Sequence, residues 1–438
     1  MPARFLARIR VDGAGPADQA AIGPATANLP LLVQSQRITL FGDIGSCMAG
    51  DGDDAVLGAL FDCGSTRPAR SLDAAQWAAI RQSQGLELIE RYWGAYVAFV
   101  VGEDAIRIVR APFGDVSCYH ARAGNVLIVA SHLDLLLAAS GQRRHIATER
   151  LARHIAYPEW RTSGTCIEGV AEVRGGDRLT VSTAGIRTET LWSPWAFVTT
   201  DRRLDDADDA ARAVAGAVRL AVAGRASELR RSVLLLSGGL DSSILAAALA
   251  RAGADFACLN LVGDDAASDE QRYATLAAES AGAMLLTRRF ELDRIDVGRS
   301  DAAHMPYPVH RCFTQAQDRM AMEVAAELGA DAILDGGGGD NVFFASRTVA
   351  ILADCLIESG FGPRFREAAR VLGDLGQTGM LTLTSMAIRR AWFRSRAPRA
   401  QAGTAFLSDS ARAAAAAEHR TAPTTLLARP HSALFASA

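Results

Sequence analysis

Residues 237–243 read SGGLDSS and follow the apolar run VLLL at 233–236. A buried strand, a glycine turn and a helix start bring backbone N–H groups and a helix dipole to one point, which favours a bound anion. Glycine lets the backbone approach a ligand closely. The stretch therefore predicts a phosphate site rather than a plain glycine turn that caps a helix. Its candidate residues are Ser237, Gly238, Gly239, Ser242 and Ser243.

Asp241 lies within the same stretch, and its carboxylate would repel a bare phosphate. The residue suits the site if it binds Mg²⁺ that bridges the phosphates. The stretch also lacks the lysine of the common phosphate loop. All 46 basic residues of the chain are arginine. No lysine Schiff base or lysine general base is therefore available, although compositional drift is the simpler reason for the bias.

A second glycine-rich stretch, DGGGGDN at 335–341, follows the short apolar run AIL. Four consecutive glycines are costly in chain entropy, and are tolerable where the backbone must wrap around a ligand. Asp335 and Asp340 flank them, and we expect Asp340 to reach the metal that Asp241 binds. The alternative is a flexible surface turn. Asp241 and Asp340 are thus the predicted metal-binding and catalytic residues.

The elements that position these residues fall into two patterns. Residues 1–195 are mostly short strands and turns, which is typical of an α+β domain. Residues 205–395 alternate apolar strands with helices, which predicts a doubly wound parallel sheet with its ligands at the carboxyl ends of the strands. The segment 396–438 is low in complexity, and we expect a loose helix or disorder there. The predicted strands are 96–101, 105–110, 125–131, 177–183, 233–236, 255–262, 284–290 and 331–335, and the predicted helices are 133–140, 149–157, 206–224, 242–253, 269–282 and 318–330.

Composition narrows the classes of protein. The 438-residue chain has a net charge of −3 and a sequence pI near 6.3, which argues against a protein that mainly binds a nucleic-acid backbone. Its seven cysteines include no CxxC pair, so free thiols in a reducing cytoplasm are expected. No secretory signal is evident, and no apolar run approaches the ~18 residues of a membrane span. We therefore expect a cytoplasmic protein without membrane insertion.

Together, SGGLDSS and DGGGGDNVFF resemble the motifs of the asparagine synthetase family of ATP-pyrophosphatase-loop enzymes. The segment 260–282 between them resembles the family's second strand and the helix after it. The resemblance implies that the chain uses ATP and Mg²⁺ to adenylate a carboxylate, releases pyrophosphate, and then forms an amide. It also implies that Leu235 and Leu259 flank the adenine, with Gly336 nearby.

The N-terminal half resembles the family's class II glutaminase domain, an N-terminal-nucleophile (Ntn) fold. That fold uses an N-terminal cysteine as nucleophile, but this chain begins Met1-Pro2-Ala3-Arg4 and has no cysteine before Cys47. The family's Asn-Gly-Glu motif falls near 61–64 and is not kept. The resemblance therefore implies a glutaminase-like domain that is catalytically empty and does not release ammonia from glutamine.

A second departure indicates the subfamily. The family loop has a glutamate where this chain has Gly337. The all-glycine version resembles lasso-peptide macrolactam synthetases (cyclases), which join an Asp or Glu side chain of a precursor peptide to its α-amine. This resemblance implies a precursor peptide as partner, together with a leader-binding or protease protein. Related cyclising members carry a lysine near the carboxyl end, so we also expect a shortened or degenerate chain.

Three alternatives remain open. One is an asparagine synthetase that uses aspartate with ammonia or glutamine; another is a degenerate scaffold that binds nucleotide or peptide. The third is a tRNA-modifying enzyme with the same loop, which the lack of a basic surface and of cysteine pairs disfavours. Lesser candidates are His304 and His310, expected in a loop near the substrate pocket, the basic segment 386–396, expected as a partly exposed helix face, and Asp115 and His120, expected to be structural.

Overall fold

The computed structural model describes most of the chain. The described residues are 3–11, 29–43, 47–50, 52–158, 161–197, 199–202, 204, 206–263, 270–299, 302, 304–308, 314–339, 349–393 and 404–421.

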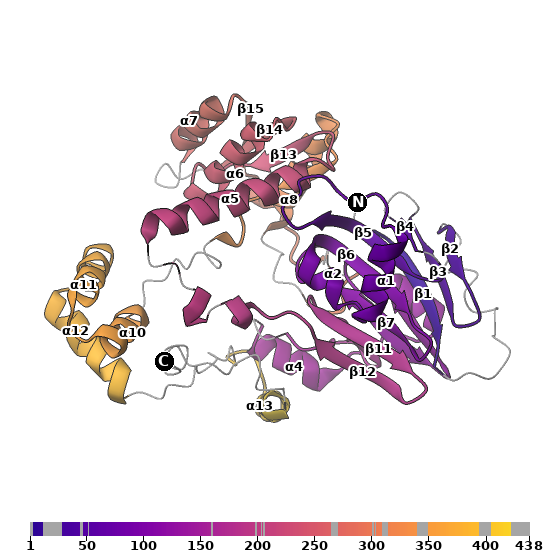
Figure 1. The fold of residues 1–438 in the computed structure, drawn as a ribbon. Helices are drawn as coiled ribbons and strands as arrows, with labels where there is room; N and C mark the ends of the chain where they lie inside the picture. Colours follow the sequence, from indigo (N-terminus) through magenta and orange to yellow (C-terminus); the bar gives the residue numbers. More distant parts are fainter. Residues whose placement is uncertain are drawn as a thin grey trace.

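Two six-stranded sheets, both antiparallel, form the N-terminal half (Figure 1). One sheet has the order β10-β8-β9-β1-β3-β2 and the other β12-β11-β7-β6-β5-β4. The strands are β1 Phe5–Arg10, β2 Leu31–Gln34, β3 Ile38–Gly42, β4 Cys47–Ala49, β5 Ala55–Asp62, β6 Tyr92–Val101, β7 Ala105–Arg110, β8 Tyr119–Ala123, β9 Val126–Ala130, β10 Val170–Glu172, β11 Asp177–Ser182 and β12 Gly185–Thr190.

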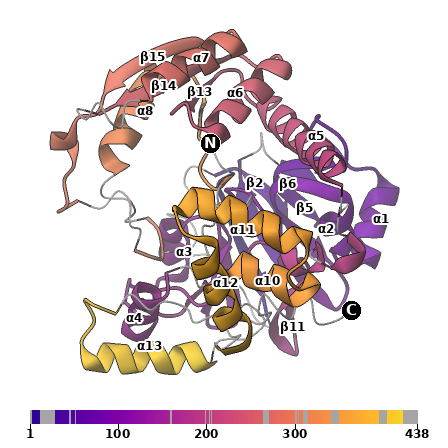
Figure 2. The ribbon, with the colours of Figure 1, turned by 90° about the vertical axis from the view of Figure 1, so that its left-hand side faces the viewer.

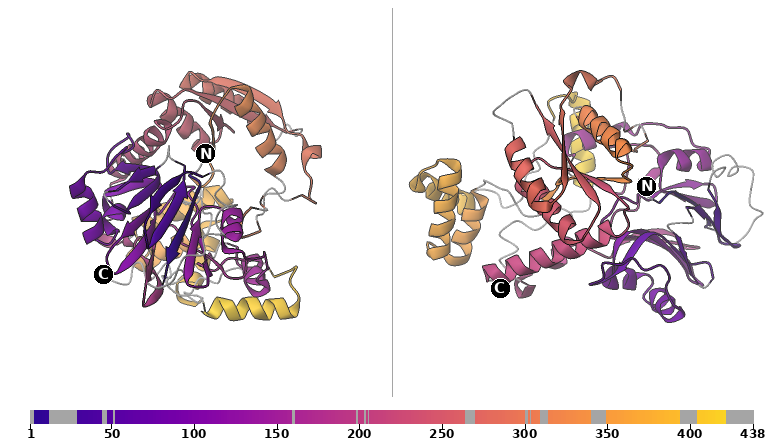
Figure 3. Two further views of the ribbon diagram at one scale, coloured as in Figure 1. Left: turned by 90° about the vertical axis from the view of Figure 1, so that its right-hand side faces the viewer. Right: turned by 90° about the horizontal axis from the view of Figure 1, so that it is seen from above.

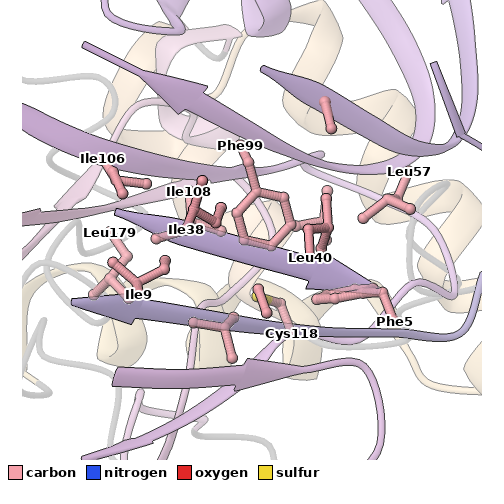
Figure 4. Packing of buried hydrophobic residues seen from close by; sticks show 14 of the residues in the cluster. Phe5, Ile9, Ile38, Leu40, Leu57, Phe99, Ile106, Ile108, Cys118 and Leu179 are labelled. Carbon is pink, nitrogen blue, oxygen red and sulfur yellow. The ribbon is translucent and has the colours of Figure 1, made fainter. Parts of the chain in front are cut away.

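The two sheets pack face to face because alternate residues of their strands are apolar. Phe5, Leu40 and Phe99 meet in the core between them (Figure 4). Phe5 and Phe99 are edge-to-face, with ring centroids 5.7 Å apart. This confirms the α+β architecture expected from the sequence for this half.

Helices cover the outer faces of both sheets. Trp77 and Leu88, on α1 and α2, pack on the sheet that contains β6, while Leu133 and Leu136 of α3 pack on the sheet that contains β9. The helices of this half are α1 Ala74–Gln82, α2 Leu86–Arg91, α3 Leu133–Ser140 and α4 Thr148–Ala156.

A four-stranded sheet, parallel throughout, follows in the C-terminal half. Its order is β15-β14-β13-β16, so the chain steps outward from β13 to β15 and then returns to the other side of β13. In such sheets a crevice opens at the carboxyl ends where the strand order reverses. The strands are β13 Ser232–Leu235, β14 Phe256–Val262, β15 Met284–Arg289 and β16 Ala332–Leu334. The α/β prediction for this half is confirmed.

Helices lie on both faces of this parallel sheet (Figure 3). Residues of α5, α6 and α7 pack with Leu234 and Cys258 on one face. Residues of α8 pack with Val233 and Leu259 on the other. The helices are α5 Ala207–Ala226, α6 Leu240–Arg251, α7 Gln271–Ala281 and α8 Gln315–Glu327.

The remaining helices form two further units. Helices α10 Ala350–Ser359, α11 Pro363–Gly376 and α12 Met380–Ile388 share their own apolar core and stand apart from the sheets (Figures 1 and 3). Helix α13 Asp409–Thr421 lies beside α4 (Figure 2), where Ala415 packs with Ala152 and Ala156. Thus the tail expected to be loose or disordered contains a docked helix.

A short segment of the C-terminal half, residues 304–308, docks on the N-terminal half. The Tyr307 hydroxyl donates a hydrogen bond to Glu172 Oε2 at 2.8 Å, and both residues are buried. Glu172 Oε1 in turn accepts from Arg110 Nη1 at 2.7 Å. Further contacts are Cys166 N to Pro306 O at 3.0 Å, His154 Nε2 to Pro308 O at 3.1 Å, and the Arg161 guanidinium over the Tyr307 ring at 5.6 Å.

Among the described residues, no helix combines the length and apolar character needed to cross a membrane.

Candidate functional site

A cavity of ≈ 620 Å³ opens at the carboxyl edge of β13, where the strand order reverses. Its volume is in the range of small-molecule sites, about 300–1,000 Å³. The two glycine-rich stretches meet there, as the parallel-sheet prediction required. The lining residues are Leu235, Leu236, Ser237, Gly239, Leu240, Asp241, Ser242, Leu259, Asn260, Leu261, Gln317, Asp335, Gly336 and Gly337.

The first glycine stretch is a turn held by its own hydroxyl groups. Ser237 Oγ accepts a hydrogen bond from Gly239 N at 3.1 Å and lies 3.2 Å from Ser242 Oγ. Ser242 is buried, and its hydroxyl also donates to Gly239 O at 3.3 Å. The serine hydroxyls that we predicted to bind phosphate thus stabilise the turn in this structure. Ser243 stays partly exposed.

The turn opens α6 without a side-chain cap. Gly239 is the N-cap residue, and no side chain of the described residues bonds the first amides of the helix. The N-terminal amides of a helix have no partner within the helix, and they carry the positive end of its dipole. Because these amides line the cavity, a ligand anion is the partner that fits them.

The second glycine stretch packs directly against the first. A Cβ added to Gly336 would lie 2.9 Å from Ser242 N, and one added to Gly339 would lie 2.1 Å from Asp241 Oδ2. Real Cβ atoms do not approach so closely. Glycine is required at 336 because the neighbouring atom is backbone, whereas a side chain at 339 would displace the Asp241 carboxylate. The four-glycine run thus allows two backbones to close around one side of the cavity, which a flexible surface turn would not need.

Asp335 is exposed at the end of β16 and accepts a hydrogen bond from Gly337 N at 2.8 Å. This bond shapes the glycine turn. A carboxylate has room for several hydrogen bonds or ligands, so the bond is compatible with metal binding by Asp335.

The carboxylates of the cavity fit a magnesium ion that is held mainly by phosphates. Within the part of the chain that the structure describes, no group of three or more His, Cys, Asp or Glu side chains could hold a metal. Asp241 and Asp335 both line the cavity, however. Mg²⁺ usually binds one or two carboxylates and completes its shell with substrate phosphates and water. Asp340 lies outside the described residues, so its predicted role stays a prediction.

Leucine side chains contribute an apolar part of the cavity lining. Leu235 and Leu261 are partly exposed there, and Leu259 is 1% exposed beneath them. Such a wall suits a flat heterocyclic ring. The sequence prediction placed Leu235 and Leu259 at an adenine, and both residues do line the cavity.

Two polar side chains of the cavity lining, Asn260 and Gln317, were not predicted as site residues from the sequence. Gln317 comes from α8, and nothing in the helical pattern distinguishes it. Asn260 gave a signal, because it is an amide in the middle of the apolar run FACLNLV of β14. It is 3% exposed, and its Nδ2 donates to Leu236 O at 2.8 Å. Two residues earlier on the same strand, burial raises the pKa of Cys258 to about 11, which keeps that thiol neutral.

The lesser candidates that the structure describes do not line the cavity. His304 belongs to the segment that docks on the N-terminal half, and His310 lies outside the described residues. Ala387 and Ala391 of the basic segment 386–396 are buried, while Trp392 is 56% exposed, which matches a partly exposed helix face. Asp115 and His120 lie in the N-terminal half; burial lowers the pKa of His120 to about 4.

The fold and site define a class: an α/β domain with a glycine turn, an uncapped helix start and cavity-lining carboxylates at its switch point. Residues 213–426 match the model of the asparagine synthase family, so the chain contains an asparagine synthase domain, an ATP-dependent amide-forming type. No curated protein matches the chain in sequence.

Two solved structures are similar. One is glutamine phosphoribosylpyrophosphate amidotransferase from B. subtilis complexed with ADP and GMP, at 11% identity and a TM-score of 0.26, covering 76% of this chain and 85% of that one. The other, described as the allosteric regulatory enzyme of purine biosynthesis, has the same identity and TM-score and covers 76% and 84%. A TM-score of this size carries no argument on its own.

Proposed function

We propose that the chain is an AMP-forming ligase that adenylates a peptide carboxylate and joins it to an amine, as a lasso-peptide macrolactam cyclase does. One observation carries the proposal: the uncapped start of α6, Asp241, Gly336 and Gly337 line one cavity within a segment that matches the asparagine synthase family model.

The proposed reaction has two steps. A carboxylate oxygen of the substrate attacks the α-phosphorus of ATP, the bond to the bridging oxygen of the β-phosphate breaks, and pyrophosphate leaves. The amine then attacks the acyl carbon, AMP leaves with the carboxylate oxygen, and the amine loses a proton. Developing negative charge on the leaving pyrophosphate is stabilised by the amides of α6 and of the glycine turns.

The carboxylates and the leucines of the cavity would have different roles in this reaction. Asp241 and Asp335 would hold the Mg²⁺, which would neutralise phosphate charge. The apolar side chains Leu235, Leu259 and Leu261 would enclose the base. The cavity would position the acyl group against the amine and so replace a bimolecular encounter with an intramolecular one.

Two sequence features support a cyclase over an asparagine synthetase. Gly337 lines the cavity where the resembled family has a glutamate, so no carboxylate is present at that position. The residues that directly precede β1, Ala3 and Arg4, include no cysteine that could release ammonia from glutamine. A substrate that brings its own α-amine needs neither group.

Substrate-dependent exchange of radiolabelled pyrophosphate into ATP tests the proposal. We expect exchange with precursor peptides that carry an Asp or Glu acceptor and none with free aspartate. Exchange with aspartate alone would instead assign an asparagine synthetase. Folded protein that exchanges with no carboxylate would assign a non-catalytic scaffold. The Asp241→Asn variant is the control for exchange by a contaminant.

A further inference from the structure

Asn260 is a buried amide in an otherwise apolar strand. It lies on β14 between Leu259 and Leu261, is 3% exposed, and belongs to the lining of the cavity. Burying an amide is costly unless hydrogen bonds replace those to water. The hydrogen bonds of its two polar side-chain atoms, Nδ2 and Oδ1, therefore decide how costly its burial is.

The Nδ2 atom of Asn260 holds the residue directly before the phosphate-binding turn. It donates to Leu236 O at 2.8 Å, while Leu236 N donates to Leu259 O at 2.9 Å. The paired positions of β13 and β14 end at Leu235 and Leu259. The side chain therefore holds the Leu236 carbonyl one residue beyond the last strand pair, while the backbone of Leu259 holds the Leu236 N–H. This sets the direction in which the chain enters Ser237.

The same turn is held from its other side by α7. Gly238 has a φ of +90°, and a Cβ added there would lie 2.6 Å from Ala274 N. The turn thus lies between the Asn260 bond and the first turn of α7. Because Gly239 caps α6, the position of this turn decides where the first amides of α6 point.

The Oδ1 atom of Asn260 is buried and has no donor among the described residues. Leaving such an acceptor unpaired costs at least as much free energy as the bond made by Nδ2 contributes, because the lost hydration of the oxygen is not replaced. On balance Asn260 does not stabilise the fold, and a leucine like its two neighbours would do as well. A half-satisfied buried amide at a ligand cavity indicates a role in that site.

We propose that Asn260 is the positioning residue of the nucleotide site: its amide holds the Leu236 carbonyl so that the Ser237–Gly239 turn aims the α6 amides at the polyphosphate. The inference rests on the proposed ATP chemistry. It assigns to Asn260 no contact with the reacting atoms.

The near-isosteric variant Asn260→Leu separates positioning from stability. It exchanges one unpaired acceptor, Asn260 Oδ1, for another, Leu236 O, so the urea midpoint should shift little. Without the bond from Asn260 Nδ2 to Leu236 O, the turn is no longer held in place. The variant should therefore bind MgATP and pyrophosphate at least tenfold more weakly than the wild type, as measured by titration calorimetry. Cys258→Ala is the matched control: it shrinks a fully buried side chain on the same strand, so stability should fall while both affinities stay unchanged.

The variant Asn260→Asp adds a readout that a purely structural role would not show. An ionised carboxylate repels Leu236 O, whereas a protonated one donates to it, and burial raises the pKa of such a group. ATP affinity should therefore recover as the pH falls, relative to the wild type at each pH. The titratable groups on the surrounding elements are unchanged in the variant: Cys258 of β14, Asp241 of α6, Tyr273 of α7 and Asp335 after β16.

The outcomes distinguish a failure of the proposed function from a failure of the proposed role of Asn260. Wild-type protein that binds neither ATP nor pyrophosphate overturns the proposed function, and the role of Asn260 with it. A wild type that binds both, with Asn260→Leu binding within twofold of it, overturns the role of Asn260 alone. If the leucine variant does not fold, Asn260→Ala replaces it with the same expected loss of affinity.

Discussion

The hydroxyl of Tyr307 donates a hydrogen bond to Oε2 of Glu172 across the junction between the antiparallel sheets and the parallel-sheet half. Burial, reinforced by the Glu172 charge, raises the pKa of Tyr307, so its proton stays on the phenol as the donor. Arg110 balances the buried carboxylate. Because the carboxylate is charged and both side chains are buried, the loss of this hydrogen bond should weaken the junction between the two halves.

The first prediction concerns this bond. Tyr307→Phe should lower the free energy of unfolding by about 1.5–3 kcal/mol, because the lost acceptor is charged. Tyr96→Phe is the matched control, since its hydroxyl donates to a neutral carbonyl, Leu88 O, within the N-terminal half; about 1 kcal/mol should be lost there. Urea denaturation measures both. A double-mutant cycle with Glu172→Gln that gives less than about 0.5 kcal/mol of coupling would contradict a direct interaction.

The second prediction concerns Asp241. Replacing it with asparagine should reduce ATP–pyrophosphate exchange about 10²-fold or more, because a preorganised electrostatic contact to the transition state is lost. Asp255→Asn is the control, an exposed aspartate paired with Arg231 at 3.0 Å; it should change stability by no more than about 0.5 kcal/mol and leave exchange intact. Equal exchange in both variants would remove Asp241 from the site.

The third prediction uses the contact between the glycine stretches. In Gly339→Ala the new methyl would collide with the Asp241 carboxylate, which must turn away. The carboxylate remains present but displaced, so the Mg²⁺ concentration for half-maximal exchange should rise about tenfold, or about 1.4 kcal/mol. Gly216→Ala on α5 meets nothing within 4 Å and should stabilise its helix by about 0.5–1 kcal/mol without altering the Mg²⁺ dependence. An unchanged Mg²⁺ requirement in Gly339→Ala would disprove the contact.

The fourth prediction follows from His120. Burial lowers its pKa from 6.5 to about 4, so the folded protein keeps this side chain neutral while the unfolded chain takes up a proton first. Its stabilising contribution is therefore complete above pH 6.5 and is lost as the pH falls from about 6.5 to 4. His120→Gln should flatten the decline of the urea midpoint between pH 7.5 and 5. The exposed His145→Gln should leave that slope as in the wild type.

Local patterns in the sequence were sufficient to predict the parallel sheet of the C-terminal half and the helices that cover it, but not helices α10 to α12. Apolar runs joined by helical repeats predicted β13 to β16 and α5 to α8 in order, and the parallel topology then required the two glycine stretches to meet. The close approach of Gly336 to Ser242 N follows from that meeting, since only glycine lets the two backbones come so close.

Other features depend on contacts that no local pattern encodes. The Ser242 hydroxyl donates a hydrogen bond to Gly239 O within its own turn. This contact depends on the side-chain rotamer of Ser242, which the sequence does not reveal. Tyr307 reaches Glu172 from 135 residues away. Helix α13 orders because its small alanines allow close approach to the alanines of α4, although its composition alone resembles a disordered tail.

The Tyr307–Glu172 bond also orders events during synthesis. A ribosome adds about 5–20 residues per second, so the 135 residues between the two partners take roughly 7–27 s to emerge. The antiparallel sheets can form long before Tyr307 has been synthesised. Until then, Glu172 and Arg110 remain exposed to water. The junction can form only after β13, β14 and β15 have been synthesised, because these strands precede Tyr307 in the chain. The folded N-terminal half therefore offers a preformed surface on which residues 304–308 dock.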